Sequence, residues 1–395
     1  MRILQVTPYY RPAYAFGGVV RSVEGMAGAL SERGHQVTVL TTDALNQTRC
    51  YGGSRDEMID GVRVLRCRNV LPWLRGRWNL STPRGMRKIA EKILPSVDVV
   101  HIHEFRTMEN LLVAPVARRL GKPIVLSPHG TLNLSTGRSR FKSAWDRLLS
   151  PGIALRIDHV IALTETELAE AKSLWSGFGA RKRPTGFRAI PNGVALSEFS
   201  PLPAAAGFRE RYRMGDSPTV LFLGRLQARK GVDILIKAFL AADVADSRLL
   251  IVGPDEGMMP QLRTLADGDP RIIFTGYLAG EARLDALAAG DIFALPANGE
   301  GQSIAVLEAM AAGLPVVISP GCNMDDVEAA GAGYVVEAAV EAFADSLREL
   351  LRDGEKQREM GAQARRLVEE RHTWDKVAEA LEGVYEGLVR ENQPR

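Results

Sequence analysis

Cysteine is scarce in this chain of 395 residues, which contains only Cys50, Cys67 and Cys322. An odd, scattered set of thiols encodes neither a disulfide framework nor a zinc cluster, so we expect reduced cysteines. Long hydrophobic runs are also missing, since no stretch reaches the roughly 18 apolar residues that span a bilayer. The first residues, MRILQVTPYYRP, lack the regions of a secretory signal. We therefore expect a cytoplasmic protein.

A third absence is that of a nucleotide-binding glycine motif. The first apolar run, 2–7, is not followed by the G-x-G-x-x-G pattern of nicotinamide and flavin enzymes, which argues against such enzymes. Instead, the loop TPYYRPAYAFGGVV has Gly17 and Gly18 at the start of a predicted helix. Paired glycines allow the backbone to approach a phosphate closely, although helix entry alone also explains them.

Short apolar runs alternate with amphipathic stretches along the chain, which is typical of α/β proteins with parallel sheets. The length exceeds what one core usually holds. The pattern predicts two doubly wound domains with a linker near residue 200, a cleft between them and long terminal helices over 338–390. The predicted strands cover 2–7, 36–41, 62–66, 98–102, 123–127, 219–223, 248–252, 271–275, 291–295 and 315–319.

The net charge of +3 hides an uneven distribution. Residues 1–199 contain 29 Lys and Arg against 16 Asp and Glu, whereas residues 200–395 contain 21 against 31. The basic first half predicts an anionic partner, such as nucleic acid, a phospholipid surface or a diphosphate-linked substrate. An uneven but solvated surface is the alternative.

The segment NGEGQSIAVLEAMAAGLPVVIS has Glu300 and Glu308 at the two ends of a small-residue turn that enters an apolar helix at about Ser303. Gly299 and Gly301 permit close backbone approach, and the helix start offers unpaired N–H groups to an anion. The carboxylates can accept hydrogen bonds from hydroxyl groups on either side of that anion. A diphosphate flanked by two sugars fits this layout, and an ordinary solvated helix is the alternative.

A second motif, GRLQARKG, follows the first strand of the second half. Arg225 comes directly after that strand, and Lys230 lies five residues later, just before a predicted helix. Two cations on one strand-to-helix loop can neutralise a departing diphosphate, since Arg offers a planar fork and Lys a point charge. A basic loop that is simply solvated is the alternative.

Taken in order, several motifs make the chain resemble the retaining glycosyltransferases of family four nearly from end to end. They are SPHG, IPNGV, GRL-x3-KG, VGPDEG, FTGYL and E-x7-E followed by AMAAGLPVV. The resemblance implies the GT-B architecture of two facing Rossmann-like domains. It implies an acceptor-binding domain over 1–199, with a C-terminal helix at about 376–395 packing back on it, and a nucleotide-sugar domain over 200–375.

The resemblance also implies residue roles. Arg225 and Lys230 would hold the donor diphosphate, Glu300 would contact donor sugar hydroxyls and Glu308 the ribose. His129 would lie beside the transferred sugar. GQSIAV departs from the bulkier, aromatic-containing GFGLPV of many members, which leaves sugar specificity open. The implied donor-binding set is Gly17, Gly18, Gly224, Tyr277, Leu278, Gly301, Gln302, Ser303, Ile304 and Glu308.

The family transfers a sugar from a nucleoside diphosphate with retained anomeric configuration and without an essential metal or other cofactor. We expect same-face attack, with the leaving phosphate taking the acceptor proton; Glu300 as a covalent nucleophile is the alternative. A saccharide or polyprenyl-diphosphate-linked acceptor is expected, and nucleic acid is not. Two rival functions are a sugar-nucleotide epimerase or hydrolase of the same fold and a non-catalytic binder of nucleotides or nucleic acid.

Two other constellations have structural alternatives. His101 and His103 alternate on a strand and could bind a metal, but without a placed third ligand we interpret them as strand-end residues near the cleft. Asp267 and Asp269 form a D-x-D sequence that we interpret as a turn. Asp255 is a predicted helix cap, and so is its neighbour Glu256.

One segment of the basic half, RVLRCRNVLPWLRGRWNLSTPRGMRKIAEKI, interleaves aromatic and cationic residues. Trp73 and Trp78 lie among arginines and lysines, a mixture that suits a membrane interface. We therefore expect peripheral binding to the inner leaflet of the plasma membrane. Packing of the tryptophans on the N-terminal core is the alternative.

Overall fold

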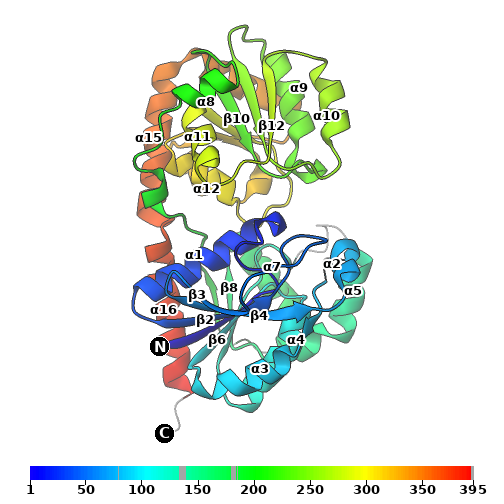
Figure 1. Ribbon diagram of the computed structural model, residues 1–395. Coiled ribbons are helices and arrows are strands. Elements are labelled where there is room, and N and C mark those ends of the chain that lie inside the picture. Colours follow the sequence, from blue (N-terminus) through cyan, green and yellow to red (C-terminus); the bar gives the residue numbers. More distant parts are fainter. Residues whose placement is uncertain (79, 133–138, 179–183, 185, 393–395) are drawn as a thin grey trace. The chain divides into compact units, whose positions relative to one another are not determined.

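The computed structural model describes residues 1–78, 80–132, 139–178, 184 and 186–392 (Figure 1). It divides the chain into two compact units. Unit 1 comprises Met1–Asn192 and Trp374–Arg395, and unit 2 comprises Gly193–Thr373. The sequence analysis places the two boundaries between these units at 199/200 and 375/376. The last residues of the expected C-terminal helix, 393–395, lie outside the described residues.

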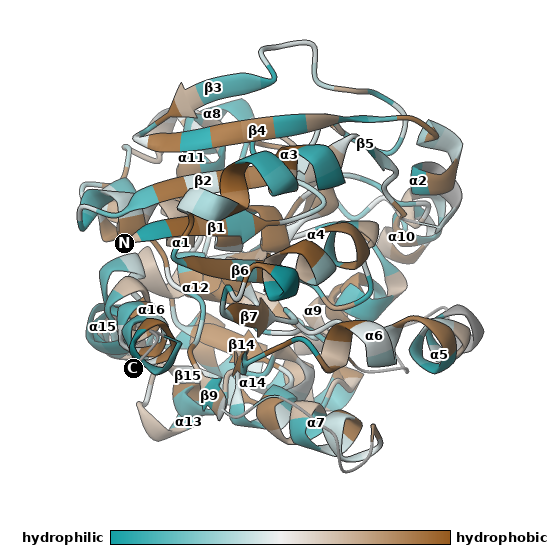
Figure 2. Cartoon of the chain, turned by 90° about the horizontal axis from the view of Figure 1, so that it is seen from below, coloured by the Kyte–Doolittle hydropathy of each residue, from teal (hydrophilic) through white to brown (hydrophobic). Residues whose placement is uncertain are grey.

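Unit 1 is built on a nine-stranded sheet in the order β3-β4-β2-β1-β6-β7-β8-β9, with β5 paired to β4. Figure 2 shows the strands from β3 to β7 in this order. The strands from β4 to β9 along this order are parallel, as the sequence predicts. The strands are β1 (Arg2–Val6), β2 (Gln36–Thr42), β3 (Asp56–Ile59), β4 (Val62–Asn69), β5 (Pro83–Arg84), β6 (Val99–His103), β7 (Ile124–Ser127), β8 (His159–Ala162) and β9 (Gly186–Ala189).

Two edge pairings depart from the predicted parallel pattern, because β3 and β5 each run antiparallel to β4. The first is a hairpin. Its two connecting residues, Asp60 and Gly61, both have positive φ values, of 49° and 78°. Asp-Gly is a preferred sequence for such a two-residue turn, so the hairpin was readable from the sequence but was not predicted.

The helices of unit 1 cover both faces of this sheet, and the C-terminal helix α16 packs against α1. Apolar residues of α16 at helical spacing, including Leu381 and Tyr385, enter a core cluster with Ile3 and Val23. The helices of unit 1 are α1 (Gly18–Glu32), α2 (Pro72–Trp78), α3 (Met86–Ile93), α4 (Met108–Arg119), α5 (Ser139–Leu148), α6 (Ser150–Ala154), α7 (Glu165–Ser176) and α16 (Trp374–Glu391), with short 3-10 turns η1 (Tyr14–Phe16) and η2 (Leu94–Ser96).

Unit 2 has a fully parallel six-stranded sheet in the order β12-β11-β10-β13-β14-β15. The chain moves outward from β10 to β12 and then returns to the other side of β10 with β13. The loops after β10 and β13 therefore diverge at a topological switch point, where open α/β sheets usually bind ligands. The strands are β10 (Thr219–Leu223), β11 (Arg248–Val252), β12 (Ile272–Gly276), β13 (Ile292–Leu295), β14 (Val316–Ile318) and β15 (Gly333–Val335).

Helices flank the second sheet on both sides, with α9 and α10 on one side and α11 and α12 on the other (Figure 1). In the described part of the chain, no helix is both long and apolar enough to cross a membrane. The helices of unit 2 are α8 (Ala206–Arg211), α9 (Val232–Ala242), α10 (Met259–Ala266), α11 (Glu281–Ala289), α12 (Ile304–Ala311), α13 (Asp326–Ala329), α14 (Val340–Arg352) and α15 (Gly354–Arg371), with 3-10 turns η3 (Leu196–Phe199), η4 (Ala228–Lys230) and η5 (Pro320–Cys322).

Candidate active site

The loop between β10 and α9 approaches the end of β13 closely because it contains a glycine. Gly231 has a φ of 65°, and a Cβ at this position would lie 2.2 Å from the carbonyl oxygen of Pro296. Any other residue would clash and would also be strained in this left-handed conformation. Gly231 thus lets the residue before it, Lys230, lie next to the loop that carries Glu300.

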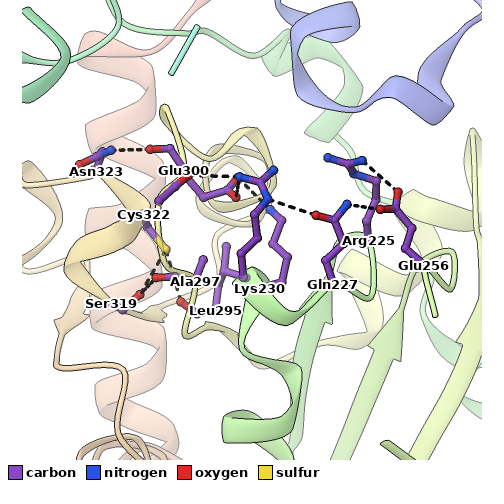
Figure 3. A network of polar contacts seen from close by, with 12 residues as sticks. Arg225, Gln227, Lys230, Glu256, Leu295, Ala297, Glu300, Ser319, Cys322 and Asn323 are labelled. Atoms are coloured by element: carbon purple, nitrogen blue, oxygen red, sulfur yellow. Dashed lines mark hydrogen bonds and ion pairs between the residues drawn. The ribbon is translucent and has the colours of Figure 1, made fainter. Parts of the chain in front are cut away.

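Lys230 and Glu300 form an ion pair at the switch point of unit 2. The Lys230 Nζ donates to Glu300 Oε2 over 2.8 Å, and both side chains are almost completely buried. Figure 3 shows the carboxylate of Glu300 directed towards Lys230. The sequence assigns one residue to a diphosphate and the other to a sugar, and the structure brings the two together across 70 positions of sequence.

Arg229 is a second cation on Glu300 that the sequence analysis missed, although it precedes Lys230 directly. Its NH1 lies 3.1 Å from Glu300 Oε1 and donates to the carbonyl oxygen of Gly299 over 3.1 Å. Burial alone would raise the pKa of Glu300, but the attraction of Lys230, then of Arg229, lowers that pKa below its ordinary value. Glu300 is therefore ionised and acts as a hydrogen-bond acceptor.

Arg225 forms a separate pair on the same loop. Its NH1 lies 2.9 Å from Glu256 Oε1, and the side-chain amide of Gln227 donates to the other oxygen of Glu256. Figure 3 shows the guanidinium of Arg225 directed towards Glu256. Of the two predicted helix caps, Asp255 is confirmed, because its Oδ1 accepts three backbone N–H groups at the start of α10. Glu256 is not a cap and binds Arg225 instead.

The backbone around Glu300 is fixed by the loop after β14. Glu300 N–H donates to the carbonyl oxygen of Gly321 over 2.8 Å, and the Asn323 amide donates to the carbonyl oxygen of Glu300. Gly299 uses a positive φ of 83°, as expected for close approach. The following Gln302 and Ser303 are buried, and Ser303 is the cap residue of α12. The turn therefore presents the first N–H groups of α12 beside the Lys230–Glu300 pair.

Glu308 is not the solvated residue of an ordinary surface helix. It lies in α12 with a side chain that is 6% exposed, and its Oε1 is 2.7 Å from NH1 of Arg283 on α11. Arg283, itself 5% exposed, also contacts Glu198 at 2.7 Å. The sequence offers no signal for Arg283, because only the packing of α11 brings it to α12.

The remaining donor-binding candidates of unit 2 lie at the ends of neighbouring strands. Gly224 follows β10, and its carbonyl oxygen would be 1.7 Å from a Cβ on Gly253, so the loops after β10 and β11 touch. Tyr277 and Leu278 follow β12; Tyr277 is 55% exposed, whereas Leu278 packs partly against the core. Asp269 of the D-x-D sequence binds Arg271 at 2.7 Å in a polar turn.

In unit 1, three candidates lie at the carboxyl edge of the sheet. Gly17, with a φ of 95°, is the cap residue of α1, which begins at Gly18. His129 follows β7, is buried, and has a positive φ of 56°. Glu167 of α7 accepts the backbone N–H of Gly130 and so holds the loop that carries His129.

His129 belongs to a buried row of histidines. His129 Nε2 lies 2.9 Å from His103 Nδ1, and the His103 ring lies next to that of His101, which contacts Tyr385 Oη and Ser127 Oγ. Burial lowers the pKa of His129 to about 3, so this imidazole is neutral near pH 7. His101 and His103 are packed strand-end residues. Among the described residues, no group of three or more His, Cys, Asp or Glu could hold a metal ion.

Comparisons with known proteins identify the family of this chain. The family described as "Glycosyl transferases group 1" matches residues 217–353, and "Glycosyl transferase 4-like domain" matches residues 17–193. A GDP-mannose-dependent alpha-(1-6)-phosphatidylinositol monomannoside mannosyltransferase of Mycolicibacterium smegmatis is 31% identical over 299 residues, which cover 69% of this chain and 73% of the relative. The chain belongs to the retaining glycosyltransferases of family four.

Further similarities support this assignment. A GDP-mannose-dependent monoacylated alpha-(1-6)-phosphatidylinositol monomannoside mannosyltransferase of Corynebacterium glutamicum is 29% identical over 335 residues, covering 81% of this glycosyltransferase and 84% of the relative. The structure of HepE from Anabaena in complex with UDP superimposes with a TM-score of 0.76 at 18% identity, covering 98% of this chain and all of the other. The GT-B fold predicted from the sequence is confirmed.

Proposed function

We propose that this glycosyltransferase moves a hexosyl group from a nucleoside diphosphate sugar to a hydroxyl group of a lipid-linked saccharide. The observation that carries the proposal is the buried Lys230–Glu300 pair beside the start of α12. It combines a cation for a phosphate with an ionised acceptor for sugar hydroxyls at one switch point. Because the mannosyltransferase relatives are named as GDP-mannose-dependent, GDP-mannose is the first donor to test.

Lys230 and Arg225 would act on the leaving group. As the bond between the anomeric carbon and the diphosphate breaks, negative charge grows on the phosphate and positive charge on the sugar. Cations and helix N–H groups that are already in place stabilise the phosphate without further reorganisation. Glu300, held by Lys230, would accept hydrogen bonds from donor sugar hydroxyls, and Glu308 would accept them from the ribose.

The acceptor would attack on the face that the diphosphate leaves. A bond forms between the acceptor oxygen and the anomeric carbon, the bond to the diphosphate breaks, and the acceptor proton passes to a phosphate oxygen. Two cations already bind Glu300, which disfavours it as the covalent nucleophile of the alternative mechanism. His129 is neutral and would serve as a hydrogen-bond partner for the transferred sugar.

Side chains on and beside α2 support a membrane-bound acceptor. Trp73 is 61% exposed, Trp78 is 38% exposed, and the preceding Val70 and Leu71 are exposed as well. This α2 surface (Val70, Leu71, Trp73, Trp78) supports the membrane interpretation over core packing. One expectation is wrong: Arg75, an arginine between the two tryptophans that was expected at the membrane interface, is buried against the carbonyl oxygens of residues 47 and 49.

The test is donor turnover by the purified full chain with GDP-mannose, UDP-glucose and ADP-glucose, each with and without a phosphatidylinositol mannoside acceptor. We expect acceptor-dependent release of the nucleoside diphosphate and, by NMR of the product, an unchanged anomeric configuration. Turnover that water alone supports would favour a hydrolase or epimerase. Binding of donors without turnover of any of them would favour a non-catalytic nucleotide binder.

A further inference from the structure

A second polar site lies in unit 1, in a groove where β3, β4 and β5 meet α3. The groove has a volume of about 660 Å³. Figure 2 shows β3 and β4 at the edge of the sheet, with α3 and β5 beside them. Its lining includes a single carboxylate, Asp56, among the described residues. Six cationic residues line it: Arg55, Arg63, Arg66, Arg68, Arg84 and Lys92.

Two of these cations are neutralised within the protein. Arg63 binds both oxygens of Asp56, over 2.9 and 2.7 Å. Arg66 is buried and binds Glu57 at 3.0 Å and the carbonyl oxygen of Arg11 at 2.7 Å. These contacts fix the positions of Arg63 and Arg66 and leave their charges compensated. The other four cations of the groove lack such contacts.

Four cations of the groove form no ion pair of this kind, although Asp56 also attracts Lys92. Within the part of the chain that the structure describes, no carboxylate forms an ion pair with Arg55, Arg68, Arg84 or Lys92. Arg68 and Arg84 are also direct partners in the antiparallel pairing of β4 with β5. Like charges directly opposite each other across two strands destabilise the pairing. An anion between the two guanidinium groups would remove this repulsion.

Part of the lining of the groove is apolar. It includes the buried Leu65 and Cys67 of β4 and Ile89 and Ile93 of α3. A volume of about 660 Å³ lies within the range of about 300–1,000 Å³ that is typical of sites for small molecules. The groove therefore suits a ligand that carries several negative charges and also has a less polar part.

We propose that this groove binds a ligand carrying two or more phosphate groups, through Arg55, Arg68, Arg84 and Lys92. Guanidinium groups bind phosphate oxygens with two parallel hydrogen bonds, so opposed Arg68 and Arg84 can clamp one phosphate while the remaining cations hold another. The ligand is either free in solution or the phosphorylated headgroup of a lipid. This site shares no residue with the donor site proposed above, and it does not depend on the proposed transferase activity.

Calorimetric titration of the full chain with inorganic tripolyphosphate tests the free ligand, and flotation with phosphatidylinositol phosphate vesicles tests the lipid. Arg68→Ala and Arg84→Ala should each weaken binding about tenfold or more, since each variant removes charge-assisted hydrogen bonds to phosphate. Both side chains are exposed, so folding should be unaffected. Lys172→Ala is the matched control, because Lys172 is an exposed cation of α7 outside both the groove and the basic segment around Trp73 and Trp78.

The pattern across variants decides the result. If Arg68→Ala weakens tripolyphosphate binding and Lys172→Ala does not, the result supports the groove with a soluble ligand. The same pattern with vesicles alone supports it with a lipid headgroup. Binding of neither probe, or equal losses in the groove variants and in Lys172→Ala, overturns the proposal. Donor turnover, measured in parallel, should be unchanged in all three variants.

Discussion

Arg283 and Glu308 form an ion pair of 2.7 Å between α11 and α12, with both side chains about 95% withdrawn from solvent. The pair holds the second carboxylate of the E-x7-E sequence in one position. Burial would lower the pKa of Arg283, but Glu308 and then Glu198 raise it, so the guanidinium stays charged. A nucleotide ribose at Glu308 would therefore meet a carboxylate that Arg283 has already oriented.

The first prediction separates this orienting role from stability. Arg283→Met should lower the free energy of unfolding of unit 2 by about 3–5 kcal/mol, because it removes one member of a buried ion pair and leaves the Glu308 carboxylate without the Arg283 charge. The double variant Arg283→Met with Glu308→Met should recover most of that loss, since an apolar pair replaces an ionic one. It should not recover donor binding. Denaturant unfolding and donor titration measure the two effects, and recovered donor binding in the double variant would contradict the role of Glu308.

The second prediction concerns Lys230. Lys230→Ala should lower turnover about 100-fold to 1,000-fold, because one well-placed donor to a developing charge contributes about 2.7–4 kcal/mol. It should cost less stability than Arg283→Met, since Arg229 still binds Glu300. The matched control is Lys237→Ala, an exposed lysine on α9. Turnover per folded molecule, with unfolding measured in parallel, tests this. Equal turnover in the two variants would remove Lys230 from the mechanism.

The third prediction distinguishes Arg225 from its ion pair. Arg225→Ala should lower turnover about 100-fold to 1,000-fold with little change in unfolding free energy, because its pair with Glu256 is partly exposed. Glu256→Gln breaks the same pair but leaves the cation in place, so it should lower turnover far less. Steady-state kinetics on both variants measures the difference. If Glu256→Gln matched Arg225→Ala, the ion pair itself, and not the cation, would be the required feature.

The strands that the sequence predicts are rich in Val, Leu, Ile and Phe, because burial in a parallel sheet leaves a strong signal. Length does not separate them from the missed strands, since the predicted β14 and the missed β15 both have three residues. β3, with the sequence DEMI, depends on its pairing with β4 through the Asp60-Gly61 turn, a local signal that was overlooked. The buried β8, with the sequence HVIA, was overlooked as well.

The site residues also differ in how far the sequence reveals them. Lys230 and Glu300 were recognisable as charged residues beside glycines and helix starts, and Glu308 by its spacing from Glu300. Their partners were not: the Lys230–Glu300 contact depends on the adjacent loops after β10 and β13, and the Arg283–Glu308 contact on the packing of α11. Sequence reasoning therefore found the polar groups suited to a ligand and missed the contacts that hold those groups without one.

The fourth prediction concerns membrane binding by the α2 surface. Trp73→Ser should weaken binding to anionic phospholipid vesicles, because an aromatic side chain that inserts into the membrane–water interface anchors the protein there. Its unfolding free energy should change little, since Trp73 is 61% exposed. Leu148→Ser, at an exposed apolar residue of α5, is the control. Vesicle flotation at low salt measures binding, and no binding by the unaltered chain would contradict the membrane interpretation.

The last prediction concerns pH and the buried Glu109 of α4, whose carboxylate accepts a hydrogen bond from Ser81. Burial raises its pKa from 4.5 to about 7. Between these values the folded chain keeps a proton that the unfolded chain has lost, so this group's stabilisation is present below pH 4.5 and is lost as pH rises to about 7. Glu109→Gln cannot titrate and should remove this loss.

Unfolding of unit 1 in denaturant at pH 5, 6 and 7 tests this. The slope of unfolding free energy against pH should become more positive in Glu109→Gln, by up to about 1.4 kcal/mol per pH unit. Glu91→Gln is the control: Arg119, then Arg87, lower the pKa of Glu91, so it titrates below this range and its removal leaves the slope unchanged. Identical slopes in Glu109→Gln and the unaltered chain would show that Glu109 is ionised in the fold. A compensating cation would then have to lie near this carboxyl group, which in this structure has hydrogen bonds to Ser81 and Thr107.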